Sequence, residues 1–88
     1  MTFVGMVVEE VQQLATQMDQ NASEIRELAS RLTSVLETTH WVGTDHDSFH
    51  SDWNGSHVPA LNAVCQGLND AAVRARQNAQ QQTDASAT

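Results

Sequence analysis

The feature that most constrains this chain is a seven-residue apolar repeat that fills its first half. Positions at alternating steps of three and four residues recur on one side of a helix, and nine of these eleven positions are apolar. They are Val4, Val7, Val11, Leu14, Met18, Asn21, Ile25, Leu28, Leu32, Val35 and Thr39. A pattern of this length predicts one long amphipathic helix over residues 4–40.

A second apolar column lies beside the first, again with seven-residue spacing. It consists of Val8, Ala15, Ala22, Ala29 and Leu36. Two adjacent columns give the broad face of a bundle helix, wider than the seam of a two-stranded coiled coil. The three alanines would let a neighbouring helix approach closely.

Asn21 interrupts the first column and allows two interpretations. A buried amide favours only the helix alignment that satisfies its hydrogen bonds, so Asn21 could fix the register of a partner helix. Alternatively, the helix twists or loosens locally and Asn21 reaches solvent.

The stretch Trp41-Val42-Gly43 predicts a turn at residues 41–43. Gly43 can adopt a positive φ, which suits the residue just past a helix end. Thr44 and Asp45 can then accept hydrogen bonds from the free amides of the next helix, and Thr44-x-x-Asp47 resembles a capping box. A second helix is therefore expected to begin near residue 45.

Pro59 is the weak point of this second helix, which we expect over residues 45–80. Its ring crowds the residue four positions earlier, and that residue is Gly55, so a kinked but continuous helix and a true break are both open. The apolar pattern also changes phase here. Beyond Pro59, the apolar stripe resumes with Leu61, Val64, Cys65 and Leu68. From Ala71 onward the stripe contains only alanine, and residues 81–88 are expected to form a disordered tail.

The predicted fold class is all-α: an antiparallel helix-turn-helix hairpin in a single domain, residues 1–88. Two helices of about 35 residues would each be roughly 50 Å long. Side by side, they cover only part of each other's apolar stripe. We therefore expect dimerisation into a four-helix bundle. The expected hairpin and dimer seam consists of Val7, Val11, Leu14, Met18, Ile25, Leu28, Leu32, Val35, Leu61, Val64 and Leu68.

The charge balance excludes some partners. Four arginines, no lysine and eleven acidic residues give a formal net charge of −7. Nucleic acids and anionic lipids attract clustered basic residues, which this chain lacks. No apolar run approaches the ~20 residues that a membrane span needs. The start has no basic region before its apolar residues, so a cleavable signal peptide is not expected.

The sequence contains several candidate sites. Trp41, Phe49 and Trp53 predict an aromatic cluster at the hairpin tip, more simply a seal for the bundle end than a ligand pocket. His46 and His50 could share a metal ion, but a solvated first turn is the simpler interpretation of these two and of His40 and His57. Cys65 lies on the apolar stripe, where a small buried residue is favoured over an intersubunit disulfide. Serines near histidines make no triad, and we expect neither a cofactor nor an enzyme.

These features together resemble the WXG-100 (ESAT-6-like) family of type VII secretion, in its actinobacterial branch. The resemblance spans nearly the whole chain: its length, its predicted hairpin and Trp41-Val42-Gly43 at the bend. An acidic cap followed by Phe49 and Trp53 strengthens it. The resemblance implies that hairpins pair as homodimers or heterodimers and are exported by a membrane ATPase. It also implies that Trp41 and Gly43, with Phe49 and Trp53, contribute to export recognition.

One departure from the family matters. The family's export signal, Tyr-x-x-x-Asp/Glu after the second helix, is missing, because the chain contains no Tyr. A partner therefore carries that signal, or this member stays inside as an adaptor.

The leading functional hypothesis is a secreted effector or export adaptor that acts through helical protein–protein contacts. Its partner would be itself or a paralogous hairpin, and it would be cytoplasmic before export and then secreted or held at the cell surface. The alternative is a cytosolic structural or regulatory four-helix-bundle protein with no connection to secretion.

Overall fold

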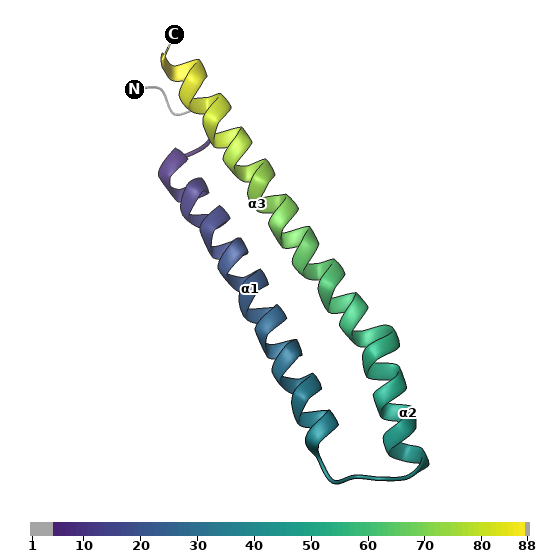
Figure 1. Cartoon of the computed structure of the whole chain (residues 1–88). Helices are drawn as coiled ribbons and strands as arrows, with labels where there is room; N and C mark the ends of the chain where they lie inside the picture. The colour runs from purple at the N-terminus through teal and green to yellow at the C-terminus, as the bar shows by residue number, and fades with distance from the viewer. Residues whose placement is uncertain (1–4, 88) are drawn as a thin grey trace.

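The computed structural model describes residues 5–87, and over that range the chain is helical with no strand. Helix α1 spans Val8–Thr38 and α2 spans Thr44–Asp52. A π-helical turn, η1, covers Trp53–His57 and leads without interruption into α3, Val58–Ala87. The second helical run returns antiparallel along α1, as Figure 1 shows. The predicted all-helical hairpin is confirmed.

The hairpin is a rod one helix pair thick. Its principal dimensions are 66 × 16 × 14 Å, and α1 and the continuous run α2–η1–α3 are the only helical segments within residues 5–87. No third element of residues 5–87 therefore covers the groove between α1 and α3. Whatever apolar surface the two helices do not bury against each other is exposed.

The first helix is shorter than the repeat suggests. It begins at Val8, because Gly5 has a φ of +91° and Val7 is extended as the N-cap residue. The predicted start at residue 4 lies outside the described residues, but residues 5–7 are not helical. The helix ends at Thr38, where the Thr39 backbone N–H and hydroxyl both donate to the Val35 carbonyl oxygen.

Gly43 has the predicted positive φ, +122°, but its role differs from the expected one. It is the N-cap residue of α2, four residues beyond the C-cap Thr39, and its carbonyl accepts from the Asp47 amide. The predicted capping box is wrong. Thr44 is already the first helical residue, and the N-cap has no side chain with which to close such a box.

Pro59 is accommodated by a wider helical turn rather than by a break. In η1 the Val58 amide donates to the Trp53 carbonyl, five residues back, instead of four as in an α-helix. The extra residue explains the change of phase read from the sequence. Most of the partly or fully buried positions of the second run follow steps of three and four. The exceptions are one step of five from Trp53 to Val58 and two additional half-buried residues, Asn69 and Ala71.

The second run also continues further than predicted. We expected the helix to end near residue 80 with a disordered tail over 81–88, but α3 extends to Ala87. Thr83 donates its hydroxyl to the Ala79 carbonyl, and the glutamines of this segment donate to acceptors one turn ahead, at Asp84 and Ser86. These local bonds are compatible with a helix despite the weak apolar stripe.

The interior of the hairpin is built from very small side chains. On α1 the buried residues are Ala15, Ala22 and Ala29, and on α3 they are Cys65, Ala72 and Ala79. Both columns have the same seven-residue spacing, and Cys65, whose thiol contacts the Ala22 carbonyl at 3.4 Å, is the largest fully buried side chain. The second apolar column, and not the predicted Leu- and Val-rich seam, closes the hairpin. We call these six residues the small-residue seam.

The small-residue seam predicts a size limit at Ala72. Replacing Ala72 by Leu should destabilise the hairpin by about 1–3 kcal/mol, because no space exists for the larger side chain between closely packed helices. Chemical denaturation followed by circular dichroism measures the effect. Ala63, exposed on the same helix, provides the matched control, and an Ala63→Leu variant should unfold close to wild type. An equal loss in both variants would contradict close packing at the seam.

Candidate functional site

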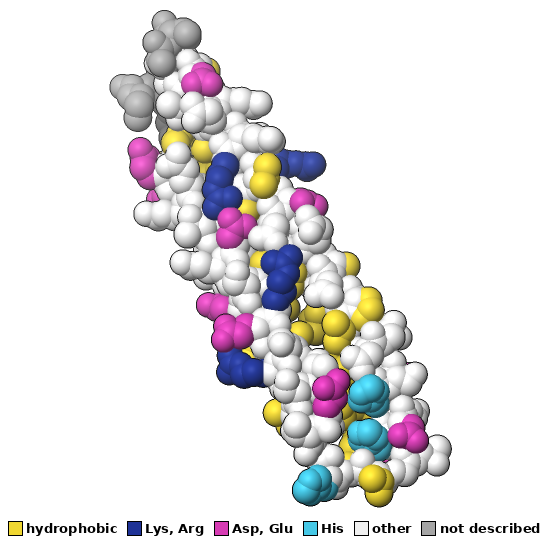
Figure 2. All heavy atoms as spheres, viewed as in Figure 1, with side chains coloured by type: hydrophobic (Ala, Val, Ile, Leu, Met, Phe, Trp, Pro, Cys, Tyr) yellow, Lys and Arg dark blue, Asp and Glu magenta, His cyan; other side chains and the backbone are white. Residues whose placement is uncertain are grey.

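One edge of the hairpin is closed by polar side chains. Asp19 lies four residues after the seam residue Ala15, and its carboxylate bridges to α3. Its Oδ1 accepts from Asn69 Nδ2 and its Oδ2 pairs with Arg76, each at 2.8 Å. Donation by Asn69 and then by Arg76 lowers the pKa of Asp19 below its ordinary value of 3.8. Figure 2, which views this edge, shows basic and acidic side chains lying across it.

The same edge is tied nearer the tip by Trp53. Its indole Nε1–H donates to Thr33 Oγ1 at 2.8 Å, and the Thr33 hydroxyl donates to the Ala29 carbonyl at 2.8 Å. Thr33 follows Ala29 by four residues, as Asp19 follows Ala15, so both side chains project to the same edge. These contacts fix the register of the two helices.

The opposite edge is apolar. Residues that lie three after, four before or one before a seam residue project to this side, and Val35 lies one before Leu36 of the same α1 column. Val11, Met18, Ile25, Leu61 and Leu68 are half-buried along it, and the exposed residues are Leu14, Leu28, Leu32, Val35 and Val64. Leu14, Leu28 and Leu32 are each more than half exposed, at 51%, 52% and 55%. We call these ten residues the open edge.

The predicted seam residues therefore do form a continuous apolar surface. The prediction that they make the interior of the hairpin is wrong. Ten of the eleven predicted residues form the open edge, and Val7, 42% exposed, precedes α1 at the end of the same column.

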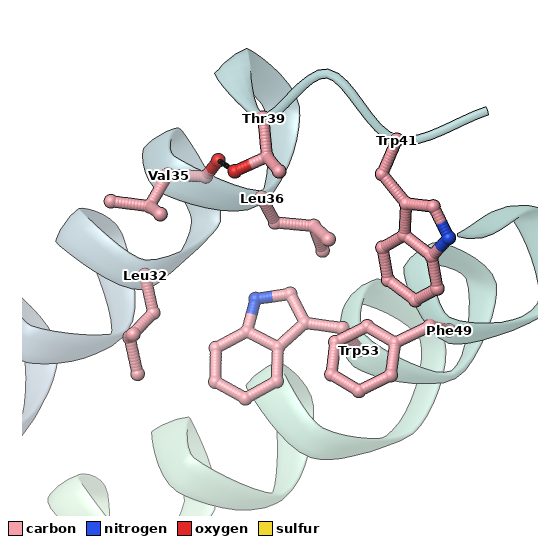
Figure 3. Close-up of a pocket in the computed structure, with 7 residues that line it drawn as sticks. All are labelled: Leu32, Val35, Leu36, Thr39, Trp41, Phe49 and Trp53. Atoms are coloured by element: carbon pink, nitrogen blue, oxygen red, sulfur yellow. Dashed lines mark hydrogen bonds between the residues drawn. The ribbon is translucent and has the colours of Figure 1, made fainter.

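A hollow at the hairpin tip adjoins the open edge. It has a volume of about 290 Å³ and is lined by Leu32, Val35, Leu36, Thr39, Trp41, Phe49 and Trp53. Figure 3 shows the rings of Trp41, Phe49 and Trp53 facing the α1 side chains across it. The Trp41 ring packs against Phe49 at a centroid distance of 5.9 Å and against His46 at 5.3 Å. The predicted meeting of the three aromatic side chains is confirmed, and together they line an apolar pocket.

Of the four residues that the resemblance implicates at the tip, three meet in this pocket. Gly43 does not line the pocket. It contributes instead to the backbone turn between the two helices, in which Trp41 also lies. Sequence reasoning missed the α1 wall of the pocket and the Thr33 acceptor. It also missed the Asp19–Asn69–Arg76 bridge, since that pairing depends on a helix register that the π turn shifts by one residue.

The other candidates contribute less. The His46 and His50 rings lie 5.8 Å apart, but no three His, Cys, Asp or Glu residues within the described part of the chain converge to hold a metal ion. Cys65 is buried in the small-residue seam. No helix within residues 5–87 is long and apolar enough to cross a membrane.

Comparisons of this chain with protein-family models, with curated proteins and with solved structures find no match.

The Asp19 bridge predicts a pH dependence with a defined sign. Because the folded-state pKa of Asp19 is lowered, its stabilising contribution is present above its ordinary pKa and is lost as the pH falls through the folded value. Asp19→Asn should therefore unfold at lower urea concentration than wild type at pH 7, with the difference shrinking as the pH falls below the ordinary value of 3.8. Asp70→Asn is the matched control, because Asp70 bonds only to Gln66 on its own helix. A constant difference across this pH range would contradict the assignment.

Proposed function

We propose that this chain is a helical-hairpin interaction protein that docks its open edge against a second hairpin and so completes a four-helix bundle. The observation that carries this proposal is that large apolar side chains lie exposed while small ones are buried. Leucines of α1 lie exposed on one edge, whereas the buried positions among residues 5–87 hold only alanine and cysteine.

The energetics favour such docking. Burying an alanine methyl contributes on the order of 0.8 kcal/mol, whereas full burial of a Leu or Val side chain contributes about 1.5–3 kcal/mol. The largest stabilisation that further burial of apolar side chains could still provide therefore lies on the open edge.

The resemblance to WXG-100 proteins gives this interaction a setting. We propose a type VII secretion protein, either an exported effector or an export adaptor, that meets the membrane ATPase as part of a hairpin pair. Three findings support it: Trp41-Val42-Gly43 connects the two helices, the helices are antiparallel, and Trp41 lines an apolar pocket next to the open edge. In this proposal the protein is cytoplasmic before export and is then secreted or held at the cell surface.

One observation favours the competing function, a cytosolic structural or regulatory bundle protein. No Tyr is available for the Tyr-x-x-x-Asp/Glu signal. The Gln80–Asp84 hydrogen bond occupies a comparable place on α3 with no aromatic ring. A gene neighbour encoding a second Trp-x-Gly hairpin or an FtsK-like ATPase would separate the two functions.

The docking proposal predicts that Leu28→Glu abolishes association without unfolding the hairpin. Leu28 is exposed in the single hairpin, so the isolated fold should change by less than about 0.5 kcal/mol. In a pair it would place a charge in an apolar interface and weaken association on the order of 100-fold or more. Sedimentation, with the wild-type chain or a cognate hairpin as partner, measures this. Ser34→Glu adds the same charge on the solvent-facing side of α1 and should associate normally.

The secretion setting predicts dependence on a partner. Expressed alone in a host with a type VII system, the chain should remain in the cells. Co-expression with a hairpin that carries the tyrosine signal should bring both proteins into the medium, and Leu28→Glu should again retain this chain inside. Secretion of the lone wild-type protein would contradict the escorted-export proposal.

A further inference from the structure

We infer that the hollow at the hairpin tip is a binding site for a small, uncharged, flat molecule of about two fused rings. This inference goes beyond the proposed function, because it concerns a pocket of the single hairpin and does not depend on a second hairpin. It rests on the size of the pocket, on the chemistry of its walls and on the way its aromatic side chains are held.

The volume of the pocket sets the size of the ligand. It is about 290 Å³, close to the lower limit of ~300 Å³ for small-molecule sites in proteins. An apolar cavity of about 150 Å³ holds one benzene ring. The tip pocket therefore has room for roughly two fused rings, and a longer molecule would extend out of it into solvent.

The walls of the pocket offer almost no polar group to a ligand. Trp53 already donates its indole N–H to Thr33 Oγ1, and the Thr39 hydroxyl donates to the Val35 carbonyl oxygen. Figure 3 shows the nitrogen of Trp41 on the side of its ring that is turned away from Trp53. A charged or strongly polar ligand would lose its hydration here without gaining compensating hydrogen bonds. The ligand is therefore uncharged.

The charges of α2, which carries part of the pocket wall, also disfavour an anion. This helix contains Asp45, Asp47 and Asp52 and no Lys or Arg. A carboxylate or phosphate group on the ligand would meet these negative charges, and no basic side chain of α2 would offset them. Fatty acids and nucleotides are accordingly poor ligands for this site.

The two walls of the pocket differ in chemistry. The turn and the second helical run supply the rings of Trp41, Phe49 and Trp53, and α1 supplies mainly aliphatic side chains (Figure 3). Aromatic rings attract another ring in edge-to-face or offset stacks, beyond what burial alone provides. Recognition of a cation uses a cage of rings instead, and the aliphatic α1 wall does not form one. An uncharged flat ring matches both walls.

The aromatic wall is held in place without a ligand. Trp53 is tied to α1 by its 2.8 Å hydrogen bond to Thr33. The Trp41 ring packs on Phe49 at 5.9 Å and on His46 at 5.3 Å, measured between ring centroids. Trp53 is also the first residue of the π turn, and π turns within α-helices are frequent at functional sites. A pocket formed in advance spares the ligand the cost of ordering it.

Titration with naphthalene tests this inference, because the two tryptophans of the chain both line the pocket. In a proton–nitrogen NMR correlation spectrum, the indole N–H signals of Trp41 and Trp53 should shift saturably, with a dissociation constant on the order of tens of micromolar. Naphthalenesulfonate, which adds a negative charge to the same ring system, should bind at least ~10-fold more weakly.

A matched pair of variants locates the site. Phe49→Ala should weaken naphthalene binding at least ~10-fold, because it removes one ring of the wall. Phe49 is 51% exposed, so the hairpin should keep its fold, which circular dichroism checks. Val73→Ala is the control, because Val73 is 52% exposed and lies on α3 outside the pocket; its affinity should equal that of wild type. Equal binding of naphthalenesulfonate, equal binding by Phe49→Ala, or no shift of the two indole signals up to the solubility limit would overturn the inference.

The outcomes separate this inference from the proposed function. If naphthalene binds the Leu28→Glu variant but not an associated wild-type pair, a side chain of the partner occupies the pocket. That result overturns the small-molecule inference and leaves hairpin docking intact. Naphthalene binding by a chain that pairs with no hairpin supports this inference and overturns the docking proposal alone.

Discussion

Close packing of alanine against alanine and cysteine is the constraint from which the other features of this hairpin follow. With Cys65 the largest fully buried side chain, the helices leave no room for larger side chains between them. The Leu, Ile and Met residues of the repeat must then lie beside the line of contact. Because Asp19, Thr33, Asn69 and Arg76 occupy one side of that line, the bulky apolar residues accumulate on the other. The polar edge and the apolar open edge both follow from the close packing of the small-residue seam.

The π turn links this seam to the tip. Pro59 removes an amide donor, and an α-helix running through it would leave the Gly55 carbonyl without its usual partner. The five-residue step from Trp53 to Val58 accommodates the proline within a continuous helix and changes the phase of the helix by one residue. As a result, Cys65 and Ala72 face α1 beyond the turn while Trp53 still faces Thr33 before it. Without the extra residue, either the seam or the indole hydrogen bond would be lost.

Much of this architecture is readable from the sequence, and the limits have physical reasons. The long repeat, the Trp41-Val42-Gly43 turn and the change of phase near Pro59 follow from spacing alone. Two adjacent apolar columns, however, do not reveal which one faces the partner helix within the chain. The larger side chains of the Leu- and Val-rich column suggested that this column faces the partner helix. Because the two helices approach closely, the alanine column faces it instead. The Asp19 bridge joins residues fifty positions apart, and only the helix register determines that Asn69, rather than a neighbouring residue, lies opposite. The end of α3 was missed because hydrogen bonds of the glutamine side chains support a helix that the apolar pattern does not require.

The tip pocket and the open edge are one continuous surface, because Leu32 and Val35 belong to both. A helix laid along the open edge must contact these two side chains, and they form part of the α1 wall that faces Trp41 and Phe49 across the hollow. The opposite wall is held in place by the Trp53–Thr33 hydrogen bond, which depends on the register of the hairpin itself. The depth and accessibility of the pocket are thus set jointly by the fold and by whatever covers the edge. A ligand or receptor that binds at Trp41 would meet a different surface on a paired hairpin than on a single one, so such recognition would be coupled through Leu32 and Val35 to the state of assembly.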